Sequence, residues 1–390
     1  MAICKLNKEY FVKGYSGDRN RFFELLDELD QNTKYIQCEE GVTLCTAEPY
    51  LDTIEYYNSI SGLRAQNCNK LLFDAANMEE LFNELKTEKT SLLEVNGKSY
   101  LTFPRVVPEI ANAAKLRGTA LNIPSKERDR YVTVLSEETP LTLVVREECG
   151  IERIVAARTG KYTPIPLATI KEIINKFLES EEIGSYLVSN WEVSQDIAQI
   201  LIEFPEFEEE MKEKYPDLPS SYIPGIVIRN GQTGYSQLAV QMYYRKDNCD
   251  RPYFIHQTSA KHYAGFDLDV FMQKVKNEVW GKVYEMPAKL AEAEQVPLTE
   301  NEANEFVKKI LKHIGIYHVF HKKDTEESKY VESVKDAIQQ WLNYNVYGRP
   351  LTAYDCIAAV MEVPDNIVLP SSYYSLLTNV TDNAWTVDLP

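Results

Sequence analysis

Residues 224–246 read PGIVIRNGQTGYSQLAVQMYYRK, and this stretch decides the class of fold. The segment GIVIR at 225–229 is followed by a glycine-containing loop at 230–234 and by apolar residues at every second position of 238–244. Two such runs around a short loop predict a β-hairpin, and a period of two predicts strands with one buried face. The stretch therefore indicates an antiparallel sheet.

Neighbouring segments carry the same kind of signal. β-branched runs at 141–146 and 151–157 flank Cys149-Gly150 and predict another hairpin. Alternating apolar residues at 198–204 predict a further strand, which Pro205 ends.

Segment 168–179 predicts the helix that covers these strands. Its apolar residues recur at helical spacing, at Ile170, Ile173, Ile174 and Phe177. Such a face needs a sheet to pack on. We expect the hairpins at 140–157 and 225–245 and the strand near 198–204 to form one antiparallel-rich sheet under this helix.

The N-terminal part predicts a mixture of helix and strand. Segment 21–29 has helical spacing, and Asn96-Gly97 supplies the turn of a hairpin. Asn77 and Glu80 form the pattern of a capping box, and Pro108 can open a helix. The polar run 119–139 predicts a solvated connection.

From residue 267 onward the apolar spacing is helical, with a capping box at Thr299 and Glu302 and a helix start at Thr352. The predicted fold class is therefore α+β: an antiparallel-rich sheet built from hairpins with covering helices, followed by a mostly helical C-terminal third. We expect an N-terminal α+β region at 1–130, a hairpin-rich α+β core at 131–265, and a helical region at 266–390 packed on that core.

Composition excludes several classes of protein. The 390 residues hold 42 basic and 59 acidic side chains, a net charge of −17, with 44% hydrophobic residues. An acidic chain disfavours broad coating of nucleic acid. No apolar run approaches the roughly 20 residues of a membrane span, and the first ten residues lack the apolar core of a signal peptide. We expect no contact with membranes and a location in the cytoplasm.

Motifs of common chemistries are missing. The seven cysteines never form a CxxC pair, and HExxH, GxSxG and GxGxxG do not occur. His313, His318 and His321 lie close in sequence, but His313 and His318 would diverge by roughly 140° on a helix. The loop at 230–234 lacks the lysine and the helix of a phosphate-binding loop. We expect no metal, no cofactor and no catalytic residue of these types.

The best candidate site is a basic and aromatic corner that follows the 225–245 hairpin. It combines arginines and tyrosines, which together stack on bases or anchor protein partners. The candidate binding residues are Arg229, Tyr235, Tyr244, Arg245, Lys246, Arg251, His256, Lys261 and His262. Cys249 with His256 or His262 is also the minimum inventory for a nucleophilic thiol. A buried thiol beside a solvated charged turn is the alternative.

Four local features carry a resemblance to a known family. They are RTGKYTPIP at 158–166, PGIVIRNGQTG at 224–234, YRKDNC at 244–249 and LLTNVTDNAW at 376–385. In this order, over roughly residues 140–390, the chain resembles a phage- and plasmid-associated family of unknown function that is common in prophages. That family's cysteine is followed by asparagine, whereas here Asn248 precedes Cys249. The resemblance implies a mobile-element origin and an intracellular role, and it supplies no catalytic residues.

Together these observations lead to a functional prediction with alternatives. We expect a non-enzymatic phage or mobile-element protein that acts in the host cytoplasm by binding a macromolecule, most simply a host or phage protein. The first alternative is a nucleic-acid-binding factor of phage replication or recombination, which net charge disfavours. The second is a thiol-dependent enzyme centred on Cys249.

Overall fold

The computed structural model describes residues 11–15, 19–39, 42–46, 91–96, 98–123, 125–148, 151–179, 185–247, 251–319 and 327–390. Helix makes up 47% and strand 27% of the structure, in antiparallel-rich sheets followed by a helical C-terminal region. The predicted α+β class is therefore confirmed. The predicted capping box at Asn77 and Glu80 lies outside the described residues.

One layer of the fold is a six-stranded sheet, here called sheet A, in the order β1-β8-β9-β10-β11-β12. Every neighbouring pair in it is antiparallel. The predicted hairpin and the strand near 198–204 are both part of it. Its strands are β1 (Phe11–Tyr15), β8 (Leu187–Ser194), β9 (Ala198–Glu203), β10 (Tyr222–Asn230), β11 (Leu238–Lys246) and β12 (Pro252–Ala260).

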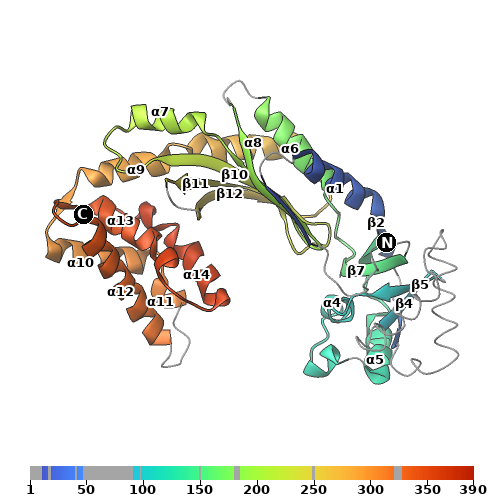
Figure 1. Cartoon of the computed structure of the whole chain (residues 1–390). Helices are drawn as coiled ribbons and strands as arrows, with labels where there is room; N and C mark the ends of the chain where they lie inside the picture. The colour runs from blue at the N-terminus through green and yellow to red at the C-terminus, as the bar shows by residue number, and fades with distance from the viewer. Residues whose placement is uncertain are drawn as a thin grey trace, which may run out of the picture.

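Helices cover one face of sheet A, as the upper side of the arch in Figure 1 shows. Helix α6 (Ala168–Leu178) buries the four apolar residues that predicted it, and α1 (Arg19–Asn32) buries Phe22, Leu25, Leu26 and Leu29. They share one core with the alternate residues of β9 to β11, including Ile200, Ile226 and Val240. Each fully buried aliphatic side chain stabilises the fold by roughly 1.5–3 kcal/mol. The prediction of a covering helix at 168–179 is confirmed.

A second six-stranded sheet, sheet B, has the order β2-β6-β7-β5-β4-β3. The predicted hairpins around Asn96 and Cys149 both lie in it, and Asn96 has the positive φ of 52° that a tight turn requires. Its strands are β2 (Thr33–Cys38), β3 (Thr43–Thr46), β4 (Ser91–Val95), β5 (Lys98–Thr102), β6 (Leu141–Glu148) and β7 (Ile151–Thr159), and its helices are α4 (Val106–Ala113) and α5 (Lys126–Ser136).

The expectation of one sheet under α6 is wrong. β6 and β7, the predicted hairpin at 140–157, pair with β2 and β5 of sheet B, while the other two predicted segments lie in sheet A. The cause is strand pairing between segments far apart in sequence, which local periodicity does not encode. Strand pairing therefore crosses the boundary expected near residue 130. Whether the three expected regions fold independently stays a prediction.

The expected solvated connection at 119–139 is also wrong. The segment forms α5, whose side chains Arg128 and Asp129 are 7% and 1% exposed and lie 2.6 Å apart as an ion pair. Ser125 caps the helix by accepting a hydrogen bond from the Arg128 backbone N–H. This charge run is partly buried because its opposite charges, Arg128 and Asp129, pair with each other.

The two sheets meet at residues 230–236, here called the junction loop. Asn230, Gln232 and Thr233 are at most 2% exposed. Gln232 Oε1 accepts hydrogen bonds from Arg146 Nη2 of sheet B at 2.9 Å and from Thr33 Oγ1 at 3.1 Å. The loop predicted as a hairpin turn therefore also joins sheet A to sheet B.

The C-terminal region is helical, as predicted, and packs against sheet A through the same core. The capping boxes at Thr299 and at Thr352 both form. Among the described helices, none is long and apolar enough to cross a membrane. The helices of sheet A's outer face and of this region are α7 (Glu206–Lys214), α8 (Leu268–Lys274), α9 (Glu285–Glu294), α10 (Glu300–His313), α11 (Ile316–Val319), α12 (Glu327–Asn345), α13 (Ala353–Met361) and α14 (Ser371–Thr381), with a short β13–β14 pair (Pro297–Leu298, Leu351–Thr352).

Candidate functional site

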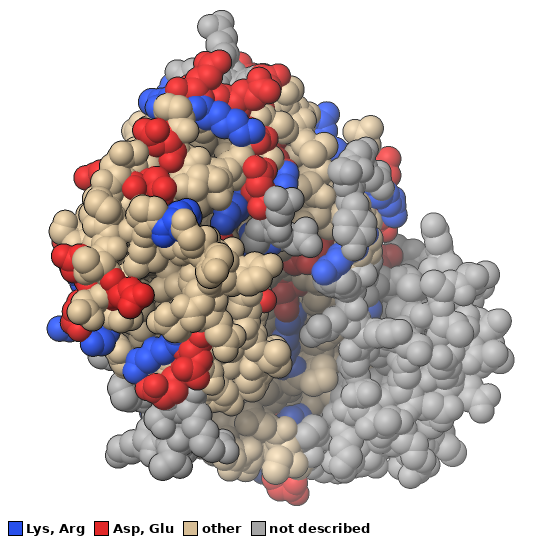
Figure 2. Space-filling view, turned by 60° about the vertical axis from the view of Figure 1, so that its left-hand side comes forward, with Lys and Arg blue, Asp and Glu red and all other residues tan. Residues whose placement is uncertain are grey.

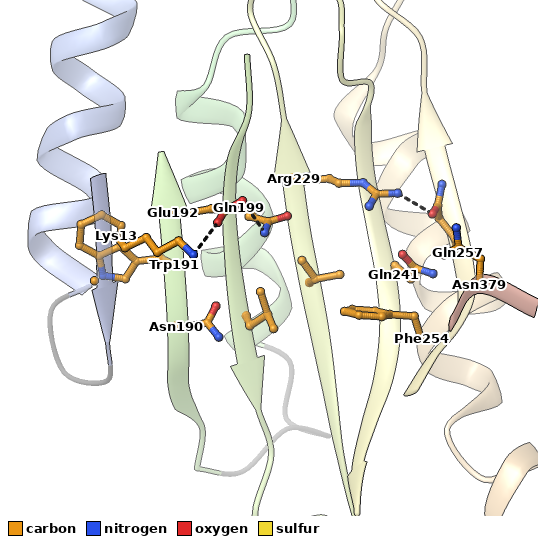
Figure 3. A pocket seen from close by; sticks show the side chains of 13 residues that line it. Lys13, Asn190, Trp191, Glu192, Gln199, Arg229, Gln241, Phe254, Gln257 and Asn379 are labelled. Atoms are coloured by element: carbon orange, nitrogen blue, oxygen red, sulfur yellow. Dashed lines mark hydrogen bonds and ion pairs between the residues drawn. The ribbon is translucent and has the colours of Figure 1, made fainter. Parts of the chain in front are cut away.

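The face of sheet A opposite α1 and α6 carries polar side chains and is hollowed into a groove (Figure 3). The residues on this face occupy the strand positions between the residues of the helix-covered core, because successive side chains of a strand point to opposite faces. Cross-strand pairing places them in rows across the sheet. One row consists of Lys13, Glu192, Gln199 and Arg229, and the next of Asn190, Leu201, Val227, Gln241 and Gln257.

The groove has a volume of about 660 Å³ and a small apolar floor. Leu201 and Val227 form this floor and are 8% and 3% exposed, and the Phe254 ring packs beside them. Amide side chains from β9, β11 and β12 surround the floor, and Asn379 of α14 adds to the lining. The groove therefore offers one apolar contact inside a frame of hydrogen-bonding groups.

Charge in the groove is nearly balanced. Lys13 Nζ lies 3.8 Å from the Glu192 carboxylate, to which Gln199 Nε2 also donates a hydrogen bond at 2.9 Å. Arg229 Nη2 donates to Gln257 Oε1 at 2.8 Å. Two cations against one carboxylate leave a single excess positive charge among the lining residues.

An ionic cluster anchors β12 beside this groove. Asp382 accepts a hydrogen bond from the Phe254 backbone N–H at 3.0 Å and from Arg251 Nη1 at 2.6 Å. Arg251 also lies 3.2 Å from Asp365. Burial raises the pKa of the Asp382 carboxyl to about 6, because the loss of hydration outweighs the attraction of Arg251. The cluster thus ties the chain after α14 to the strand that carries Phe254.

Three predicted site residues are not on the surface. Tyr244 is fully buried on the helix-covered face, and its hydroxyl donates to the Val283 carbonyl. His262 is 6% exposed, with Nδ1 accepting from the Ile165 N–H and Nε2 lying 3.0 Å from the Ser236 carbonyl. Arg251 belongs to the anchoring cluster and its side chain is 10% exposed. The prediction that these three form an exposed binding surface is wrong.

Acidic partners neutralise most of the remaining corner. Arg245 makes two hydrogen bonds to Glu203, each 3.0 Å long, Lys246 pairs with Glu362, and His256 Nε2 lies 3.1 Å from Glu285. Burial lowers the pKa of His256. Lys261 is exposed. The local positive charge that marked this corner in the sequence is therefore largely balanced by residues far away in the chain.

Tyr235 lies at the junction of the two sheets. Its ring is stacked by the guanidinium groups of Arg105 at 4.6 Å and Arg158 at 4.4 Å, and its hydroxyl donates to Glu109. All three partners come from the sheet B side. Although 53% of Tyr235 is exposed, its contacts join the sheets.

No catalytic arrangement is found around the described corner residues. Cys249 lies outside the described residues, so thiol chemistry there stays an untested alternative. His262 uses both ring nitrogens for backbone contacts. Within the described part of the chain, no group of three or more histidine, cysteine or acidic side chains could hold a metal ion. His318 and His321 have side chains outside that part.

Of the predicted site residues, only Arg229 lines the groove. The sequence does carry a signal for some of the other groove residues. Gln199 and Gln241 occupy the positions between the buried apolar residues of β9 and β11, and such positions point to the opposite face of the sheet. Strands β1, β8 and β12 were not predicted, so the rows that cross them could not be assembled from sequence. Comparisons of the chain with protein-family models, with curated proteins and with solved structures find no match.

Proposed function

We propose that this chain is a non-enzymatic binding protein that holds a segment of a partner protein in the groove of sheet A. The observation that carries the proposal is the frame of amide side chains around an apolar floor. Amide groups both donate and accept hydrogen bonds, as the backbone of an extended peptide requires. The floor of Leu201 and Val227 would take one apolar side chain of that peptide.

The charge of the groove favours a protein over a nucleic acid. A strand of nucleic acid carries a phosphate on every nucleotide and is held mainly by several cations. Among the described residues that line the groove, the cations are Lys13 and Arg229, and Lys13 already faces Glu192. Figure 2 shows that acidic and basic side chains are mixed with each other on the coloured part of this face of the molecule.

The kind of partner and the place of binding are proposed from the resemblance to the prophage-associated family. We propose that the partner is a host or phage protein and that binding takes place in the host cytoplasm. A nucleic-acid-binding role and a thiol enzyme remain the competing proposals, and the first of these is an outcome of the experiment below.

Site-directed photo-crosslinking of the full chain in expressing cells tests the proposal. Benzoylphenylalanine replaces Asn190 in the groove, Lys261 in the basic and aromatic corner, or Tyr347, which is 93% exposed and far from both in sequence. We expect covalent adducts at Asn190 that protease removes and nuclease leaves intact, and none at Tyr347.

Other results contradict specific parts of the proposal. Adducts at Lys261 without adducts at Asn190 would return the binding site to the basic corner. Adducts at Asn190 that nuclease removes would replace the protein partner by a nucleic acid. Equal adducts at all three positions would show nonspecific contact.

A further inference from the structure

Arg229 is the one groove cation that lacks a carboxylate partner among the described residues. Within that part of the chain, Arg229 Nη2 donates a 2.8 Å hydrogen bond to the amide oxygen of Gln257. Half-buried guanidinium groups normally pair with an anion, since they lose hydration without compensation otherwise. Burial lowers the pKa of Arg229, which agrees with a cation that no nearby acid stabilises.

Arg245 provides the comparison within the same sheet face. It lies on the neighbouring strand, and Glu203 binds it through two hydrogen bonds of 3.0 Å each. The pKa of Arg245 is raised, first by the hydrogen bonds to that carboxylate. The sheet thus supplies a carboxylate to one of these two arginines and leaves the other facing the groove.

The surroundings of Arg229 suit an incoming anion. Because Gln257 Oε1 faces the guanidinium, the Nε2 amide of Gln257 is oriented away from it as a further donor. Val227 and Leu201, in the next row, give an apolar contact on the adjacent side. The parallel N–H groups of a guanidinium match the two oxygens of a carboxylate.

We infer that Arg229 is a receptor for a single carboxylate of the bound peptide, supplied by an aspartate, a glutamate or a C-terminus next to an aliphatic side chain. The inference rests on the proposed function. A second anion further along the row that contains Arg229 would meet Glu192 on β8, so a polyanion fits this groove poorly.

The test selects peptides from a displayed library of random sequences, about twelve residues long, on the purified full chain. The variants are Arg229→Gln, Arg229→Lys and, as a matched control, Arg117→Gln at an exposed position outside the groove. We expect the wild type and Arg117→Gln to enrich peptides with an acidic residue beside Leu, Ile or Val. In anisotropy titrations, Arg229→Gln should bind a selected peptide at least about tenfold more weakly.

A peptide in which the acid is replaced by its amide completes a double-mutant cycle. The wild type should lose the same factor with this amide peptide, whereas Arg229→Gln should bind both peptides alike. Arg229→Lys should restore part of the preference for the acid, and circular dichroism checks that each variant is folded.

The outcomes separate the inference from the proposed function. Selected peptides without an acidic preference, or an acidic preference that survives Arg229→Gln, would overturn the inference and leave peptide binding in the groove intact. Binding of a fluorescent 20-nucleotide oligo-dT, with no peptide enriched, would overturn both. Failure to bind either probe would likewise contradict both.

Discussion

At the scale of single residues, the anchoring cluster places one arginine between two carboxylates. Arg251 lies 2.6 Å from Asp382 and 3.2 Å from Asp365, and Asp382 is 1% exposed. One positive charge does not fully compensate two carboxylates that have lost part of their hydration. Loss of hydration at the buried Asp382 carboxyl is the main reason why its pKa lies above that of an ordinary aspartate, and the charge of Asp365 adds to this effect.

The first prediction concerns the pH dependence of this cluster. The folded chain binds the Asp382 proton with a pKa of about 6, above the roughly 4 of an unfolded aspartate. The stability that the protonated carboxyl contributes is therefore present at low pH and lost as the pH rises through about 6. Asp382→Asn removes this titration.

Urea unfolding of both proteins between pH 4 and pH 7 measures the effect. The free energy of unfolding of the wild type, minus that of Asp382→Asn, should fall by up to about 3 kcal/mol over this range. A difference that stays constant, or that grows with pH, would contradict the account of Asp382.

The second prediction concerns Gly14, which pairs directly with Trp191 across β1 and β8. A Cβ at position 14 would overlap the indole ring, which packs against Phe22 at a centroid distance of 5.6 Å. We expect Gly14→Ala to lower the free energy of unfolding by about 1–3 kcal/mol. In a Trp191→Leu background the penalty should shrink by at least about 1 kcal/mol, and equal penalties in the two backgrounds would refute the steric cause.

At the scale of elements, the junction loop is unusual for a hairpin turn because its residues 230–233 are buried. Tyr162 Oη donates to the Gln232 carbonyl at 2.7 Å, and Asn230 Nδ2 donates to the Ile165 carbonyl at 3.0 Å. Thr233 Oγ1 donates to Asp196 at 2.6 Å. A buried loop needs such partners for its polar groups, and here neighbouring elements supply them.

The third prediction tests this loop with two glutamines of the same hairpin. Gln232 is 2% exposed and its Nε2 donates to Asp30 at 2.6 Å, whereas Gln237 is exposed. Gln232→Ala should lower the free energy of unfolding by about 2–4 kcal/mol, because it leaves Arg146 and Asp30 short of partners. Gln237→Ala should change it by less than about 0.5 kcal/mol. Equal effects in urea unfolding would show that the loop's contacts are not stabilising.

At the scale of the whole molecule, the two larger hydrophobic cores of the described residues meet at a polar junction. One core lies under sheet A and includes the C-terminal helices, and the other lies in sheet B. Arg105 spans the junction with two hydrogen bonds to Asp196, of 2.5 and 2.7 Å, beside the contacts of Gln232. Cooperative unfolding of the two cores therefore depends on polar contacts.

The fourth prediction is that the wild type unfolds in one calorimetric transition. In the Arg105→Ala, Gln232→Ala double variant the two cores should lose their coupling and unfold in two transitions. Differential scanning calorimetry decides between the two, through the ratio of calorimetric to van't Hoff enthalpy. Two transitions in the wild type, or one in the double variant, would contradict a junction made by these residues.

The sequence by itself determined the local elements. The helix at 168–179, the hairpins around Asn96, Cys149 and residues 230–236, and the capping box at Thr299 depend on periodicity and turn chemistry within short windows. The α+β class followed from these elements.

Only the tertiary structure decided which strands share a sheet and which charges are free. β6 and β7 joined sheet B through β2, more than 100 residues earlier along the chain, and distant acids such as Glu362 and Asp382 neutralised the basic corner. The groove likewise needs six strands in register before its rows exist. Contacts between residues far apart in sequence leave no periodic signal, because each partner is chosen by the packing of the whole chain.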